Sequence, residues 1–114
     1  MGRVRDEVVS AVLPLLEEGE LLEAYTLGIQ QESPYHTAVA LTSRRLRIAS
    51  PTGGRNIEFE NLRSIRWSGL WARLNIETAA PRKRIVISVF GREWKDKARA
   101  LAESARRRIP ARRP

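Results

Sequence analysis

Apolar and polar residues alternate through the middle of this chain, from Leu21 to Phe90, and this alternation limits the possible folds more than any other feature. Successive side chains of a β-strand point to opposite faces of a sheet, so an apolar residue at every second position predicts a strand with one buried face. Turn-forming residues separate the segments at hairpin spacing. The sequence therefore predicts a mainly β domain of about seven antiparallel strands with one face in water. The apolar positions of the seven segments are Tyr25, Leu27 and Ile29; Val39 and Leu41; Leu46 and Ile48; Ile57 and Phe59; Ile65 and Trp67; Leu74, Ile76 and Thr78; and Ile85, Ile87 and Val89.

Helical spacing is confined to the two ends of the chain. A stripe of apolar residues four apart predicts an N-terminal amphipathic helix, which Pro14 interrupts: Val4, Val8, Val12 and Leu16. A second stripe, which includes Trp94 and Leu101, predicts a helix from Arg92 to Arg108 that covers the last strand from outside. We therefore expect an amphipathic helix over 1–19, a β domain over 20–109 and a basic flexible tail over 110–114.

Size and composition exclude several classes of protein. The 114 residues suffice for one domain, and the absence of cysteine excludes disulfides and thiolate metal sites. The longest uncharged apolar stretch, Val8 to Leu16, is far shorter than the ~20 residues that span a bilayer. Asp6 and Glu7 fall where a signal peptide has its basic region, so we expect a cytoplasmic protein.

Charge is distributed unevenly along the chain. Residues 1–43 hold 2 basic and 7 acidic side chains, whereas residues 44–114 hold 19 basic and 6 acidic ones. A basic surface of this kind suits an acidic protein, anionic lipid or nucleic acid. A general preference for arginine in the source genome explains the excess equally well.

Several short motifs resemble those of one known family. The segment ALTSRRLRI at 40–48 resembles the ALT-x-RRL hairpin of bacterial pleckstrin-homology-like (PH-like or GRAM-like) domains. LEEGE at 16–20 is similar to the L-x-x-GE that precedes their first strand, and 62–78 is similar to their fifth and sixth strands. The resemblance, over about 16–109, implies a partly open barrel of two nearly orthogonal sheets. It also implies a C-terminal capping helix with Trp94 at the family's packed tryptophan, and a role in binding or scaffolding without catalysis.

Phosphoinositide binding is not implied by this resemblance. Lipid-binding members carry spaced basic residues in the first hairpin loop, whereas residues 29–35 contain one acid and no base. The same analogy places the loops 30–34, 51–54 and 79–83 at one end of the barrel. That end would gather four basic residues: Arg55, Arg82, Lys83 and Arg84.

Basic clusters supply the candidate anion-binding residues. Arg82, Lys83 and Arg84 share one turn and repel one another, which makes them the first candidates. The cations at the end of the last helix are stabilised by the helix dipole, and this explains them as well as a contact role does. The full set of candidates is Arg55, Arg82, Lys83, Arg84, Arg106, Arg107 and Arg108.

The remaining charged residues have structural interpretations. Arg45 and Arg47 share one face of a strand and are expected to pair across it with Glu58 and Glu60. The acidic residues near the start of the β domain are expected to form a solvated face: Glu17, Glu18, Glu20 and Glu23.

Groups suited to catalysis are scarce. His36 is the single histidine, and no Ser–His–Asp pattern or second metal-ligating residue accompanies it. We therefore expect no enzyme activity, no cofactor, no metal and no small-molecule substrate.

Leu70 and Trp71 occupy a hairpin tip and are candidate partner contacts, although inward packing of Trp71 into the barrel mouth is the favoured interpretation.

The sequence predicts a scaffolding module that docks a protein partner or associates with its own copy through Val4, Val8, Val12 and Leu16. Peripheral binding to the anionic inner membrane through basic residues is the first alternative. Weak, non-specific nucleic-acid binding is the second, and the scarcity of aromatic residues disfavours it.

Overall fold

The computed structural model describes residues 16–30, 36–50 and 53–109, which form seven strands, one 3-10 helix and one α-helix. A mainly β fold with a C-terminal helix is therefore confirmed. The predicted helix residues Val4, Val8 and Val12 and the tail 110–114 lie outside the described residues. The elements are β1 (Leu22–Gln30), β2 (His36–Thr42), β3 (Arg45–Ser50), β4 (Gly53–Glu58), η2 (Phe59–Asn61), β5 (Leu62–Ser68), β6 (Arg73–Ala79), β7 (Arg82–Ser88) and α2 (Arg92–Arg106).

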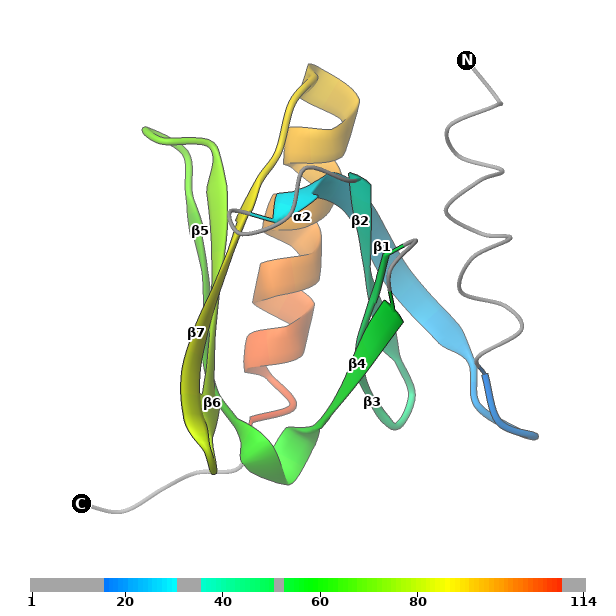
Figure 1. Cartoon of the computed structure of the whole chain (residues 1–114). Helices are drawn as coiled ribbons and strands as arrows, with labels where there is room; N and C mark the ends of the chain where they lie inside the picture. Colours follow the sequence, from blue (N-terminus) through cyan, green and yellow to red (C-terminus); the bar gives the residue numbers. More distant parts are fainter. Residues whose placement is uncertain (1–15, 31–35, 51–52, 110–114) are drawn as a thin grey trace.

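All seven strands belong to one antiparallel sheet, in the order β4-β3-β2-β1-β7-β6-β5. Figure 1 shows that the sheet divides into two halves, β1 to β4 on one side and β5 to β7 on the other, with α2 between them. Strands β4 and β5 are the two edges, so the sheet is open. Strand pairing joins the two halves where β1 meets β7, at Ile29 opposite Ser88 and Gln30 opposite Ile87.

The junction between β1 and β7 depends on Gly28. A Cβ atom at this position would lie 2.5 Å from Cγ2 of Ile87 and 2.6 Å from the carbonyl oxygen of Ser88. Real Cβ atoms do not approach other heavy atoms so closely, and the Ser88 oxygen belongs to the backbone. The strands can therefore cross here only because residue 28 has no side chain.

Helix α2 packs into the space between the two halves, mainly against β1 and β5. Its buried face consists of Ala98, Leu101, Ala102 and Ala105, and these small side chains let the helix lie close to the sheet. The sequence suggested that this helix covers the outer face of the last strand. This expectation is wrong, because α2 packs mainly against β1 and β5. Phe90, on that face, is 62% exposed.

Trp94 lies at the start of α2 and is half-buried. Its ring centroid is 6.2 Å from that of Tyr25, and its carbonyl oxygen accepts a hydrogen bond of 2.9 Å from Thr26 Oγ1. The ring contacts both the main core and a second apolar cluster. Leu101, about two turns further along the helix, is completely buried.

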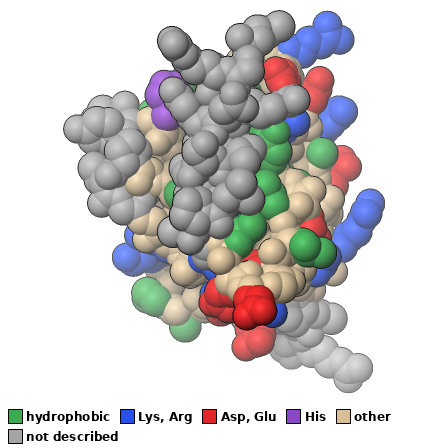
Figure 2. Space-filling view, turned by 90° about the vertical axis from the view of Figure 1, so that its right-hand side faces the viewer, with side chains coloured by type: hydrophobic (Ala, Val, Ile, Leu, Met, Phe, Trp, Pro, Cys, Tyr) green, Lys and Arg blue, Asp and Glu red, His purple; other side chains and the backbone are tan. Residues whose placement is uncertain are grey.

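That second cluster covers the outer face of β1 and β2, where Ala38 and Ala40 are buried. Strand β2 is consequently buried on both faces, and the expectation of one wet face is wrong there. Leu16, the last residue of the predicted N-terminal stripe, packs against this cluster. Figure 2 shows hydrophobic side chains along the middle of this side of the molecule and acidic ones at its lower edge.

Two strands differ in detail from the sequence prediction. In β1 the buried positions are Thr26, which bonds to the start of α2, and Gly28, which lies against β7. The fourth strand ends at Glu58, and Phe59 belongs to the 3-10 helix that turns the chain toward β5. Phe59 still packs against the core.

Gly28→Ala should lower the free energy of unfolding by about 1–3 kcal/mol, because the new Cβ forces β1 away from β7. Urea denaturation followed by circular dichroism measures this change. Gly69→Ala is the matched control, since its Cβ would meet no atom nearer than Trp67 Nε1 at 3.8 Å. Its unfolding free energy should change by less than about 0.5 kcal/mol. Equal losses in the two variants would show that Gly28 has no special role.

Candidate functional site

Three large hydrophobic side chains are exposed together at one end of the molecule. Leu70 is 84% exposed, Trp71 68% and Phe90 62%. The backbone N–H of Val89 donates a 2.9 Å hydrogen bond to the carbonyl oxygen of Ala72, which joins the tip of the β5–β6 hairpin to the end of β7. Trp71 and Phe90 directly flank this bond. We call Leu70, Trp71 and Phe90 the apolar end.

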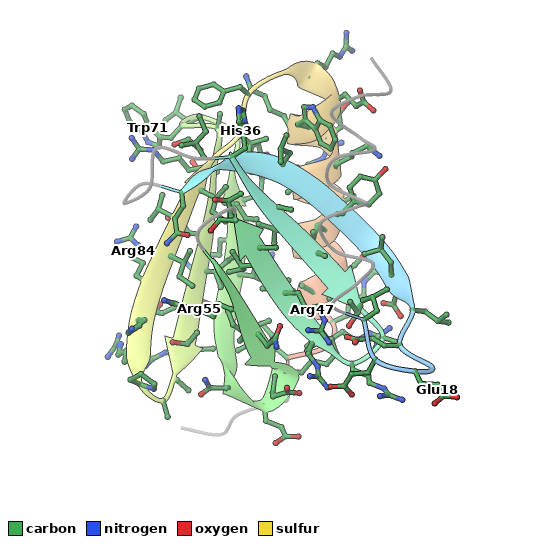
Figure 3. The ribbon with its side chains drawn as sticks, turned by 45° about the vertical axis from the view of Figure 1, so that its right-hand side comes forward. Glu18, His36, Arg47, Arg55, Trp71 and Arg84 are labelled. Carbon is green, nitrogen blue, oxygen red and sulfur yellow. The ribbon has the colours of Figure 1, made fainter. Side chains whose placement is uncertain are left out.

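The outward position of Trp71 corrects the favoured sequence interpretation, which packed this ring into the barrel mouth. The turn after β5 is tight: the N–H of Trp71 lies 3.4 Å from Ser68 Oγ, and Ala72 adopts a left-handed backbone conformation with φ 52°. The ring therefore projects from the tip of the hairpin (Figure 3). Phe90 was not identified from the sequence as a contact residue, although its apolar side chain on the outer face of the last strand was a signal for it.

The candidate anion-binding residues do not form one cluster. Arg82 pairs with Glu77 at 3.1 Å, and Arg108 pairs with Glu23 at 2.7 Å. Arg84 donates a hydrogen bond of 3.2 Å to Asn75 Oδ1. The remaining candidates are exposed and form no salt bridge within the described part of the chain: Arg55, Lys83, Arg106 and Arg107.

The expected gathering of loops 51–54 and 79–83 is wrong. The N–H of Ala80 donates a 2.8 Å hydrogen bond to Asn61 Oδ1, so the β6–β7 turn lies beside η2, which follows the end of β4. The pair Gly53 and Gly54 begins β4, and a strand of six residues spans about 16 Å. Arg55, on β4, also lies in the other half of the sheet from Arg82, Lys83 and Arg84 on β7, with three strands between them.

A buried ion pair joins Glu20, which precedes β1, to Arg47 of β3. Glu20 and Arg47 are both almost inaccessible to solvent, and their closest approach, from Arg47 Nη2 to Glu20 Oε1, is 2.6 Å. The N–H of Glu17 and the hydroxyl of Thr42 also donate to the Glu20 carboxylate. Arg47 donates further to Asn56 Oδ1 at 2.8 Å. The expectation that Glu20 belongs to a solvated face is therefore wrong.

The neighbouring charges complete this network. Arg45 lies 3.4 Å from Glu58, as the strand pattern predicted, and 3.0 Å from Glu17. Glu17 also pairs with Arg44 at 3.1 Å. Glu18 is exposed, and Figure 3 shows it at the end of the molecule opposite Trp71.

Burial of the Glu20 carboxyl opposes its ionisation, but hydrogen bonds from Arg47, Thr42 and the Glu17 backbone, with the charge of Arg47, outweigh burial. The pKa of Glu20 is consequently lowered from 4.5 to about 2. The carboxylate stays charged at neutral pH and is saturated with intramolecular partners. Its role is structural.

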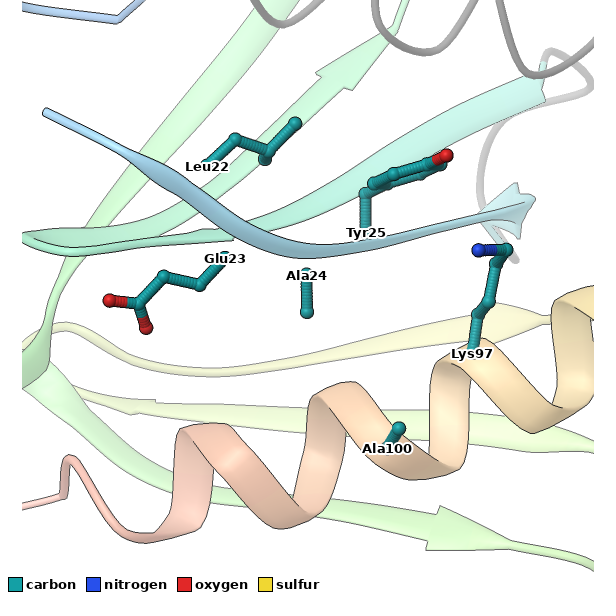
Figure 4. Close-up of a pocket in the computed structure, with 6 residues that line it drawn as sticks. All are labelled: Leu22, Glu23, Ala24, Tyr25, Lys97 and Ala100. Carbon is teal, nitrogen blue, oxygen red and sulfur yellow. The ribbon is translucent and has the colours of Figure 1, made fainter.

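The described residues line two hollows of interest. One, of about 270 Å³, opens between β1 and α2, where Lys97 Nζ lies 4.8 Å from the centre of the Tyr25 ring (Figure 4). The other, of about 540 Å³, is a groove on the outer face of β5, β6 and β7. It is lined mainly by polar and charged side chains, among them Arg66 and Arg84.

His36 is exposed at the start of β2 (Figure 3). Within residues 16–30, 36–50 and 53–109, no group of three or more His, Cys, Asp or Glu side chains is arranged to hold a metal ion. No helix in these same ranges is both long enough and apolar enough to span a bilayer. No protein-family model matches the chain, and no curated protein matches it.

Glu20→Gln should destabilise the protein at pH 7 by about 3–5 kcal/mol, because it leaves the buried Arg47 without a counter-charge. The folded-state pKa of Glu20 is the lower one, so the stability from this pair is present above about pH 4.5 and is lost as the pH falls toward 2. The difference between wild type and Glu20→Gln should therefore shrink over that range.

Urea denaturation at pH 7, 4.5 and 2.5 measures this dependence. Glu23→Gln is the control, since its pair with Arg108 is solvent-accessible and should contribute no more than about 1 kcal/mol. A Glu20→Gln variant as stable as Glu23→Gln at pH 7 would contradict the assigned role of the buried pair.

Proposed function

We propose that this chain is a non-enzymatic docking module of PH-like architecture that binds a partner protein through the apolar end. Seven antiparallel strands followed by one helix packed between the halves of the sheet support the PH-like assignment. Domains with this layout bind or scaffold. The observation that carries the proposal is the joint exposure of Leu70, Trp71 and Phe90.

Exposure of single apolar side chains is ordinary on protein surfaces, and Leu21, 67% exposed, is such a case. Three large ones on neighbouring segments are different, because they expose much apolar area to water at one end of the molecule. Tryptophan is also among the residues that contribute most to binding at protein interfaces. The core of the domain is complete without these three side chains, so their place at the surface is explained by a partner.

Self-association through the stripe Val4, Val8, Val12 and Leu16 stays a prediction. Within the described residues, Leu16 already packs against Ala38 and Ala40 of its own sheet. The first alternative is peripheral binding to an anionic membrane. A membrane would compete with a protein partner for the apolar end, because tryptophan and arginine both suit the membrane interface.

Site-specific photocrosslinking in the native cell tests the proposal. The photoreactive residue p-benzoylphenylalanine replaces Trp71 in one variant and the equally exposed Leu21 in the control. We expect a discrete protein adduct at position 71, none at position 21, and loss of the adduct when Phe90→Asp is added. Adducts of equal yield at both positions, or adducts with lipid alone at position 71, would refute protein docking at this end.

Trp71→Ala should weaken binding of the crosslinked partner by at least thirtyfold, or about 2 kcal/mol, because the lost ring is central to the interface. Its melting temperature should equal that of wild type, since the ring is outside the core. Isothermal titration calorimetry with the purified partner measures the affinity. A thirtyfold loss for Leu21→Ala as well would contradict the location of the interface.

A further inference from the structure

The outer face of β5, β6 and β7 is set by their pairing register. Ile65, Ile76 and Ile85 pair across the inner face and are buried in the core. The alternate positions therefore lie together on the outer face. They form three rows across the strands: Ser64, Glu77 and Arg84; Arg66, Asn75 and Val86; and Ser68, Arg73 and Ser88.

Positive charge exceeds negative charge on this face. Arg66, Arg73 and Arg84 are exposed, and within the described ranges none of the three forms a salt bridge. The one acid of the three rows, Glu77, already pairs with Arg82 at 3.1 Å, and this hydrogen bond lowers its pKa. Three guanidinium groups are thus left to attract an anionic occupant. Figure 3 shows Arg84 on the outside of this half of the sheet.

The groove of about 540 Å³ runs along these rows and has polar hydrogen-bonding groups in its floor. Three strands are about 10 Å across, which matches the width of one helix or one extended segment. Asn75 and Arg84 offer donors beside the groove, and Arg84 is held in place by its hydrogen bond to Asn75. The Ser64 hydroxyl donates to Glu77.

The groove is continuous with the apolar end. Ser68 lines the groove, and its hydroxyl lies 3.4 Å from the N–H of Trp71 in the adjoining hairpin. Arg73 begins β6 immediately after that hairpin. A bound segment whose apolar side chains contact Trp71 can therefore place its neighbouring residues beside the arginines of the groove.

We propose that the groove and the apolar end together bind an acidic amphipathic segment of a partner protein, with its carboxylates on Arg66, Arg73 and Arg84. This inference rests on the proposed function, because it takes the apolar end as the docking surface. A single protein segment can lie along the groove, whereas a flat bilayer surface cannot enter it.

A second copy of the chain is a poorer occupant. Among the described acidic residues before Arg44, Glu17, Glu20 and Glu23 are already engaged by arginines of the same chain. A different protein with free carboxylates matches the charge of the groove better.

A synthetic peptide of sixteen residues that mixes Leu and Phe with Asp and Glu serves as the probe. Its control is the same peptide with Asn and Gln in place of the acids. We expect the acidic peptide to bind the full-length protein at least tenfold more tightly than the control. Backbone amide NMR shifts should move for Ser68, Arg73 and Ser88, and binding should weaken as salt increases.

Two variants of equal net charge then locate the site. Arg66→Gln/Arg84→Gln should weaken binding of the acidic peptide at least tenfold, whereas Arg55→Gln/Arg106→Gln, which removes exposed arginines elsewhere, should leave it within twofold. Equal weakening in both would show attraction by overall charge alone and overturn the inference. Failure of the acidic peptide to bind more tightly than its neutral control would also overturn it.

The failures of the two proposals can be told apart. If the cellular adduct forms at position 71 but p-benzoylphenylalanine at position 66 gives none, docking at the apolar end stands and the groove is not part of it. If neither position gives a protein adduct, both proposals fall. Salt-sensitive binding to phosphatidylglycerol vesicles that Arg66→Gln/Arg84→Gln abolishes, without peptide binding, would assign the groove to a membrane. If Arg66→Gln/Arg84→Gln does not fold, two measurements on the wild-type protein decide the question. They are the salt dependence of its affinity for the acidic peptide and its affinity for the neutral control peptide.

Discussion

The two halves of this protein form one sheet because two backbones approach each other at a residue without a side chain. Gly28 allows β1 to reach β7, and the pairing of Ile29 with Ser88 follows directly after it. Strand β1 also carries the surface on which α2 rests, so the position of the helix depends on the same junction. The junction also fixes the end of β7. The N–H of Val89, just after this strand, donates to the carbonyl oxygen of Ala72, and this hydrogen bond brings Phe90 and Trp71 to the same end of the molecule.

The ion pair between Glu20 and Arg47 fixes the start of β1 in a different way. Removing two charges from water is costly, and a buried pair is tolerated only where nearly every polar atom has a partner. Here the Glu20 carboxylate accepts from Arg47, from Thr42 and from the backbone of Glu17. These bonds tie the segment before β1 to β2 and β3. Glu17 and Glu20 belong to this network and Glu23 pairs with Arg108, whereas Arg66, Arg73 and Arg84 form no salt bridge within the described part of the chain.

The surfaces that form the core are separate from the proposed docking surface. The inner faces of the sheet and α2 bury an aliphatic core, and neither Trp71 nor Phe90 contributes to it. An exposed apolar end gains nothing from folding but becomes favourable once a partner covers it. The register that buries Ile65, Ile76 and Ile85 also places Arg66, Arg73 and Arg84 on the opposite face. One alternating pattern thus produced both the core and the proposed binding groove.

The sequence by itself determined the seven strands, the C-terminal helix and the pairing of Arg45 with Glu58, because these depend on local alternation and on neighbouring strands of a hairpin. Only the tertiary structure decided that Glu20 is buried against Arg47, 27 residues away, that Trp71 faces water, and that residues 82–84 belong to β7, in the other half of the sheet from Arg55. Alternation tells which residues share a face of a strand but not what lies against that face. That depends on the order in which the strands pair, which includes a junction of β1 with β7 that has no room for a side chain at Gly28.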